Sequence, residues 1–248
     1  MRPTQQIRNV ALVGHNGSGK TSLAEALLFR AGVIGKPGTI ERCDTVLDHD
    51  PEEHDLQQTI SLSVASFDWK DHRINLIDTP GYADFRGEAL LGLSAADLAV
   101  FVIDAVSGEQ AQDVVLWRAA ERMGIPRLVF VHKLDRPRSS FDRTLSQVRE
   151  AFGSHADPPE LPIGEETSFH GVTDLLTHQA LVYDTGQATE VDVPEELAAQ
   201  EQAEHDHLVE DVVELDDDAL EQYLEGAEPS VEQVERLLHE AVDQALVY

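Results

Sequence analysis

The chain has 248 residues and a formal net charge of −29, and 42% of its residues are hydrophobic, which suffices for the core of a large α/β domain. No uncharged run approaches the length of a membrane span, and residues 1–10 lack the apolar segment of a signal peptide, so we expect a cytoplasmic protein. The single cysteine, Cys43, excludes an internal disulfide and suits a reducing compartment.

Charge divides the sequence into two regions. Residues 1–156 contain 21 acidic and 17 basic residues, whereas residues 157–248 contain 26 acidic residues and one basic residue, Arg236. Two prolines, Pro158 and Pro159, interrupt a helical pattern at this boundary, so we expect two domains, 1–156 and 157–248. The acidic region should repel nucleic acid and suits a basic protein partner, although a solvated acidic surface explains the composition equally well.

The first region predicts strands that alternate with helices. Apolar runs indicate strands at 9–13, 64–70, 73–77, 98–103 and 127–131, and helical spacing indicates helices at 22–30, 83–95 and 110–122. The second and third strands read as a hairpin. Alternating units of this kind predict a mostly parallel sheet with helices on both faces, and ligands of such folds bind at the carboxyl ends of the strands.

A phosphate-binding loop follows the first strand. Residues 14–21 match the pattern G-x-x-x-x-G-K-[ST] at every fixed position. The backbone amides of such a loop and the following helix N-terminus surround a phosphate. Lys20 is expected to reach the outer phosphates, and the Thr21 hydroxyl is expected to ligate Mg²⁺. The expected nucleotide contacts are Gly14, His15, Asn16, Gly17, Ser18, Gly19, Lys20 and Thr21.

A second motif, Asp78-Thr79-Pro80-Gly81, ends the strand at 73–77. A carboxylate that emerges beside the phosphate loop is the expected second anchor for Mg²⁺. Gly81 allows its backbone amide to approach the terminal phosphate. Alone this motif is weak evidence, but its place after a phosphate loop and at a strand end strengthens it.

The third motif, His132-Lys133-Leu134-Asp135, ends the strand at 127–131. The Asp135 carboxylate can accept two hydrogen bonds from guanine that adenine cannot supply, and the Lys133 stem can cover the base. The three motifs in this order favour a guanine-nucleotide-binding protein. An ATP-binding protein with the same phosphate loop is the disfavoured alternative.

These motifs, together with residues 104–108, resemble the GTP-binding domain of translational GTPases, and most closely that of elongation factor G and its elongation factor G-like relatives. Segments 161–164, 171–175, 193–197 and 223–226 resemble the insert that elongation factor G carries in this domain. The resemblance implies a P-loop GTPase fold with an inserted acidic, α-rich α+β subdomain. It also implies GTP or GDP with Mg²⁺ as ligands, the ribosome and its stalk protein as partners, and a last sheet strand that begins at 245–248.

The resemblance assigns roles to two further residues, Thr59 and Tyr82. Thr59 aligns with the switch threonine that binds Mg²⁺ in the GTP state, with a surface threonine as the alternative. Tyr82 stands where the family has the histidine that positions the attacking water, so Lys20, Gly81 and Tyr82 are the implied catalytic residues. A phenol is a poorer proton acceptor than imidazole, and hydrolysis should therefore be slow.

Two other residues and one tripeptide depart from the family pattern. Gly17 replaces an aspartate, His132 replaces an asparagine, and Leu56-Gln57-Gln58 replaces Arg-Gly-Ile. The implied function is GTP binding with slow or impaired hydrolysis. The alternative is a non-hydrolysing, nucleotide-gated module that binds the ribosome or its stalk protein.

Two remaining features have simpler interpretations. Asp104 is expected to shape the turn after its strand. His205 and His207 could bind a metal ion, but an H-x-H spacing on a helix directs the two imidazoles to different faces, which favours a solvated helix.

Overall fold

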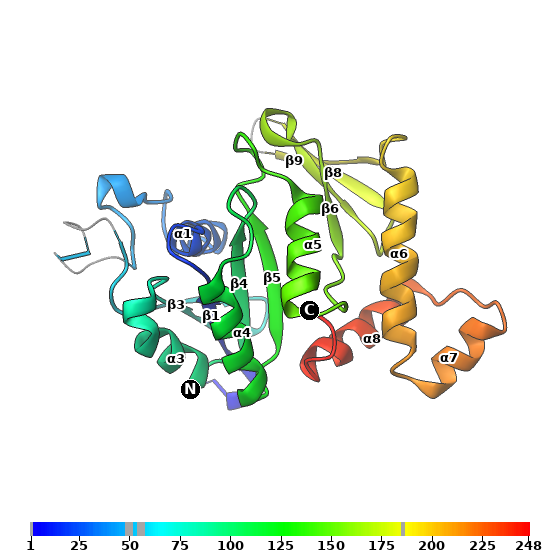
Figure 1. Cartoon of the computed structure of the whole chain (residues 1–248), viewed down its shortest axis with the longest axis horizontal. Helices are drawn as coiled ribbons and strands as arrows, with labels where there is room; N and C mark the ends of the chain where they lie inside the picture. Colours follow the sequence, from blue (N-terminus) through cyan, green and yellow to red (C-terminus); the bar gives the residue numbers. More distant parts are fainter. Residues whose placement is uncertain (1, 48–51, 54–57, 185–186) are drawn as a thin grey trace. The chain divides into compact units, whose positions relative to one another are not determined.

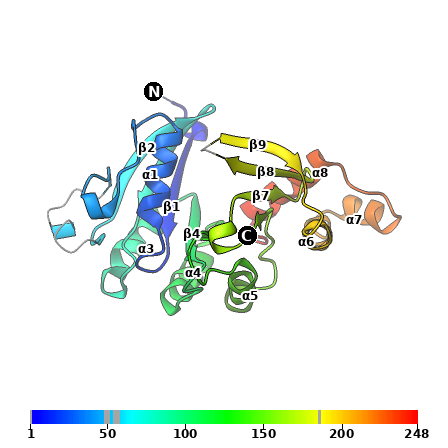
Figure 2. The same ribbon diagram turned by 90° about the horizontal axis from the view of Figure 1, so that it is seen from above.

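The computed structural model describes residues 2–47, 52–53, 58–184 and 187–248. Contacts divide the chain into two compact units, Met1–His132 and Lys133–Tyr248, and each unit has its own β-sheet (Figures 1 and 2). The first unit ends where the third motif begins. The expected domains 1–156 and 157–248, which rest on charge and on family resemblance, stay a prediction.

The first unit contains a five-stranded sheet in the order β2-β3-β1-β4-β5. Its strands are β1 (Ile7–Val13), β2 (Ser63–Trp69), β3 (His72–Asp78), β4 (Leu98–Asp104) and β5 (Arg127–His132). All neighbouring pairs are parallel except β2 and β3, which are antiparallel. The predicted hairpin and the mostly parallel sheet are therefore confirmed.

Helices cover both faces of this sheet. They are α1 (Lys20–Arg30), α3 (Arg86–Ser94) and α4 (Ala111–Met123), with short 3₁₀ turns at Thr4–Gln6, Ile40–Arg42 and Ala83–Phe85. Val100 of β4 packs in one apolar cluster with Leu28 of α1. The next residue, Phe101, meets Trp117 of α4 edge-on, with ring centroids 4.8 Å apart. Successive residues of β4 thus bury against different helices, as strand geometry requires.

The second unit combines helices with a four-stranded antiparallel sheet, β6-β7-β8-β9. Its strands are β6 (Glu160–Ile163), β7 (Gly171–Asp174), β8 (Gln179–Asp184) and β9 (Gln187–Asp192), with a 3₁₀ turn at Glu166–Ser168. Its helices are α5 (Phe141–Phe152), α6 (Ala198–Val213), α7 (Asp217–Leu224) and α8 (Val231–Asp243), and Figure 1 shows the last three grouped together.

The three last helices share a small core. Leu208, Val212 and Val213 of α6 pack with Ala219 of α7 and Leu237 of α8, and all five are buried. These residues follow the apolar periodicity of amphipathic helices, whose outer faces carry the acidic residues.

The end of the chain differs from the expectation. Residues 245–248 form no strand; Ala245 adopts a left-handed conformation (φ 57°) that turns the backbone after α8. Tyr248 then donates from its amide to His155 O (3.2 Å) and from its hydroxyl to Phe152 O (2.6 Å).

Among the described residues, no helix combines the length and the apolar composition that a membrane span requires.

Candidate nucleotide-binding site

The phosphate loop connects the end of β1 to the start of α1. Gly19 is the residue before α1 and has a left-handed backbone (φ 110°), and Gly14 has φ 147°. A Cβ on Gly14 would lie 2.5 Å from Val102 O of β4, so a side chain does not fit there. Asn16 and Gly17 are exposed, whereas the Ser18 side chain is buried. The loop thus folds as the motif predicts.

The buried Lys20 side chain donates hydrogen bonds to carbonyl oxygens of this loop. Its Nζ donates to Gly14 O and to His15 O, at 2.9 Å each, and the residue is only 6% exposed. Burial lowers the pKa of Lys20 below its ordinary value, while the carboxylates of Asp78 and Asp113 oppose this shift. An anionic phosphate beside the ammonium would favour its charged form, so the lysine is prepared for such a ligand.

Oxygen atoms from three segments meet at the start of α1. The Thr21 hydroxyl donates to Asp78 Oδ2 (2.6 Å), and the Thr59 hydroxyl oxygen lies 3.5 Å from that of Thr21. Asp78 is fully buried at the end of β3. Hydroxyl and carboxylate oxygens are the ligands that Mg²⁺ prefers, so the three expected metal ligands fit this ion.

A buried carboxylate positions the segment that carries Thr59. Glu53 is 2% exposed and accepts hydrogen bonds from the amides of Ile60 (2.9 Å) and Ser61 (3.2 Å). The amide of Gln58 donates to Glu53 O (3.2 Å). Sequence reasoning missed Glu53, because a glutamate in an unpatterned loop carries no signal of burial. The departures at Leu56 and Gln57 lie outside the described residues.

The second motif is fixed to both the sheet and the phosphate loop. The Thr79 hydroxyl donates to Leu12 O of β1 (2.7 Å). A Cβ on Gly81 would lie 2.5 Å from Asn16 N, so Gly81 is needed for a close approach between two backbones. Tyr82 follows as the residue before a 3₁₀ turn, and it is 40% exposed.

The third motif begins at the end of β5. His132 Nδ1 lies 3.1 Å from Ser18 O, and its ring fills the space beside Gly19 where a Cβ would otherwise point. His132 therefore supports the phosphate loop. Asp135 belongs to the second unit, where its exposed carboxylate lies 3.7 Å from Arg136 Nε. Lys133 has a left-handed backbone (φ 62°).

Two aspartates that are not in the three motifs organise the surrounding turns. Asp113 is fully buried at the start of α4, and its Oδ2 lies 2.9 Å from His15 Nδ1 and accepts from the Gln110 amide (2.9 Å). Sequence reasoning missed Asp113, although its place three residues after Gln110 in a capping box was a readable signal. Asp104 accepts from the Val106 amide (2.7 Å) and thus shapes its turn, as expected.

The family model described as "Elongation factor Tu GTP binding domain" matches residues 5–244. A solved structure of a protein from Thermus thermophilus is similar to this chain, with 39% sequence identity and a TM-score of 0.92. The similarity covers 98% of this chain and 36% of the Thermus chain, so this chain spans about a third of the length of that protein.

The family model matches nearly the whole sequence, and this match determines the family. The geometry agrees with it, because the phosphate loop follows β1, and Asp78 and Gly81 follow the neighbouring strand β3. The chain belongs to the family of the elongation factor Tu GTP-binding domain, and it is therefore a GTP-binding domain of the translational GTPase type.

Proposed function

We propose that the chain binds GTP and GDP with Mg²⁺ and hydrolyses GTP slowly, as an elongation factor G-like domain of the cytoplasm. The observation that carries this proposal is that the phosphate loop and the second motif meet where β1 and β3 end. The residues that meet there are Lys20, Thr21, Asp78 and Gly81, and Thr59 lies beside Thr21. Phosphate would contact the loop amides and Lys20, and the oxygens of Thr21, Thr59 and Asp78 would hold Mg²⁺.

The base would be selected by the third motif. Asp135 would accept two hydrogen bonds from guanine, and Lys133 would cover the ring. Adenine would leave the Asp135 carboxylate unpaired, which usually costs a few kcal/mol when the group is desolvated. His132 supports this assignment indirectly, because its contact with Ser18 O links the motif to the phosphate loop.

Slow hydrolysis follows from the residue after Gly81. A bound Mg²⁺ would supply charge stabilisation at the phosphates, as it does in phosphoryl transfer generally. The Gly81 amide would lie at the terminal phosphate, and Tyr82 would stand beside the attacking water. Its phenol accepts a proton less readily than imidazole and is longer, so it would hold the water less well.

A non-hydrolysing binding module remains the second candidate, because Tyr82 and Gly17 alter the hydrolytic part of the site while the nucleotide contacts are kept. The partner would be the ribosome or its stalk protein. The acidity of residues 157–248, with 26 acidic residues and one basic residue, supports a basic protein surface as the partner. Phosphate release with and without ribosomes distinguishes the two candidates.

Calorimetry with GDP, ADP and xanthosine diphosphate tests the nucleotide assignment. The chain should bind GDP more tightly than ADP, and Asp135→Asn should shift the preference toward the xanthine nucleotide. Asp243→Asn, an exposed carboxylate on α8, is the matched control and should change nothing. Equal affinity for ADP and GDP would remove the guanine assignment.

A further inference from the structure

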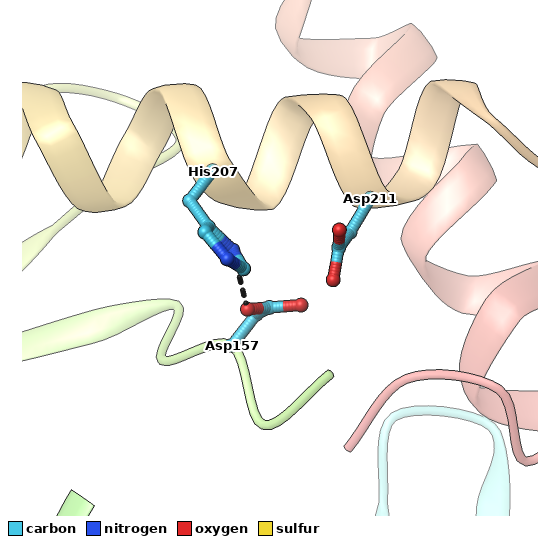
Figure 3. Close-up of side chains that lie close together, drawn as sticks. All are labelled: Asp157, His207 and Asp211. Carbon is cyan, nitrogen blue, oxygen red and sulfur yellow. Dashed lines mark ion pairs between the residues drawn. The ribbon is translucent and has the colours of Figure 1, made fainter. Parts of the chain in front are cut away.

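A cluster of metal-ligating side chains lies in the second unit, on residues that have no part in the nucleotide site. Asp157 precedes β6, and His207 and Asp211 lie on α6. One ligand atom from each of the three residues lies within 4.8 Å of the other two (Figure 3). The spacing of four residues places His207 and Asp211 on the same face of the helix, and both point toward Asp157.

Asp157 is buried in a way that calls for a cation. Its side chain is 1% exposed, and His207 Nδ1 lies 2.9 Å from its Oδ1. Among the described residues, however, neither carboxylate oxygen has a hydrogen-bond partner of acceptable geometry. A buried carboxylate without hydrogen bonds is costly unless a charge compensates it.

The nearby arginine is already engaged elsewhere. Arg149 Nη2 donates to Glu204 Oε2 (2.8 Å) and Arg149 Nε to Ala156 O (3.1 Å), whereas Nη2 is 3.6 Å from Asp157 Oδ1. Within the part of the chain that the structure describes, the two carboxylates thus face the imidazoles of His207 and His155 and, at 3.6 Å, the Arg149 guanidinium.

We propose that Asp157, His207 and Asp211 bind a divalent transition-metal cation of the zinc type. One imidazole and two carboxylates suit zinc better than magnesium, which prefers oxygen ligands alone. His207 is 46% and Asp211 16% exposed, so the ion has a path from solvent. His155 Nδ1 lies 2.6 Å from Asp211 Oδ2 and would orient that carboxylate. A bound zinc ion would require donor distances of about 2.0–2.2 Å to each of the three side chains.

The geometry expected for the H-x-H spacing is confirmed. His205 Nδ1 lies 2.7 Å from Leu175 O, and the His205 ring is 4.5 Å from that of His178. His207 turns instead toward Asp157. The two imidazoles therefore face different ways. The other two ligands of the proposed site are Asp211, one helical turn after His207, and Asp157, in the loop before β6.

Zinc titration of the full chain by calorimetry tests this site. The protein carries Cys43→Ser, which removes an exposed thiol, and is saturated with GDP and Mg²⁺, so that the phosphate site is occupied. We expect one equivalent of zinc to bind at micromolar concentration and to raise the thermal midpoint. His207→Ala and Asp211→Asn each alter a direct ligand and should weaken binding by more than the about 10–100-fold that loss of an outer-shell partner typically costs.

The matched controls are His239→Ala and Asp243→Asn. These two residues form an exposed histidine–carboxylate pair with the same four-residue spacing on α8, at 3.5 Å. Unchanged zinc binding in the controls together with loss in the α6 variants supports the site. No stoichiometric binding by the parent protein, or equal effects of both pairs of variants, overturns it. His207 and Asp211 are partly exposed, so the test does not depend on whether Asp157→Asn folds.

Discussion

The imidazole of His15 lies 2.9 Å from the carboxylate of Asp113, and the Asp113 side chain is fully buried. This pair joins the phosphate loop to the first turn of α4, where Asp113 also accepts from the Gln110 amide. His15 is one of the positions that the phosphate-loop pattern leaves open, and α4, which lies outside that pattern, holds its side chain in place.

Asp113→Ala should therefore destabilise the protein and weaken nucleotide binding together. It removes the partner of a buried histidine and a helix-capping carboxylate, which should cost about 1–3 kcal/mol of the free energy of unfolding. Denaturant unfolding with and without GDP measures both effects. Asp243→Ala, which removes an exposed partner of His239, should have little effect. Equal stability of the two variants would contradict a structural role for Asp113.

Gly81→Ala should impair nucleotide binding, because the added Cβ would lie 2.5 Å from Asn16 N and 2.5 Å from His15 C. The backbone of the phosphate loop or of the second motif must then shift. Gly87→Ala is the control, since a Cβ at this position of α3 meets nothing within 4 Å. The control should be neutral or stabilising by about 0.5–1 kcal/mol. Calorimetric GDP affinities and thermal midpoints of both variants test this expectation.

Tyr82→His should accelerate GTP hydrolysis. It introduces the histidine that the resemblance to elongation factor G implies at this position, while leaving Lys20, Thr21 and Asp78 unchanged. The absence of a positioned proton-transfer group typically costs about 10²–10⁴-fold in rate. Single-turnover hydrolysis with and without ribosomes should be measured for both forms. Fast, ribosome-stimulated cleavage by the unmodified chain would refute the proposal of a weakened GTPase. If Tyr82→His does not hydrolyse GTP faster, the other departures from the family pattern limit the rate.

His132→Ala should weaken binding of guanine nucleotides, because the ring contacts Ser18 O at 3.1 Å and covers Gly19. His132→Asn, which restores the family residue and an amide donor, should retain or improve affinity. Competition titrations with GDP measure the difference. If both variants bind GDP as the parent does, the imidazole has no supporting role in the loop.

Binding of a stalk protein, if it is electrostatic, should weaken in moderate salt and after neutralisation of exposed acids such as Glu214, Glu221 and Glu225. Affinity measured at several salt concentrations checks this. Binding that survives both changes would require a different account of the acidic region.

Sequence patterns identified the elements of the first unit well, because glycines, strand ends and apolar periodicity carry local signals. The phosphate loop, Asp78 and the β2–β3 hairpin were all predicted at or near their observed positions. The sequence did not predict the four strands β6–β9 individually. These strands are short, and their apolar and polar residues do not alternate clearly enough to indicate a strand.

The supporting carboxylates were missed for a related reason. Glu53 and Asp113 act on residues that are distant in sequence or placed in loops, and burial of a single charged residue leaves no pattern in its neighbours. The same holds for Asp157, whose ligand partners His207 and Asp211 lie some fifty residues away along the chain. Tertiary contacts of this kind become visible only with coordinates.

The hydrogen bond from the Thr79 hydroxyl to Leu12 O has a mechanical consequence. It anchors the backbone of the second motif to the central strand one residue after Asp78, at a fully buried position. Asp78 and Thr79 are therefore held against the central strand, whereas this hydrogen bond does not constrain Pro80 and the residues that follow it. Under the proposed function, the Asp78 carboxylate on the magnesium side would therefore belong to the fixed part of this motif.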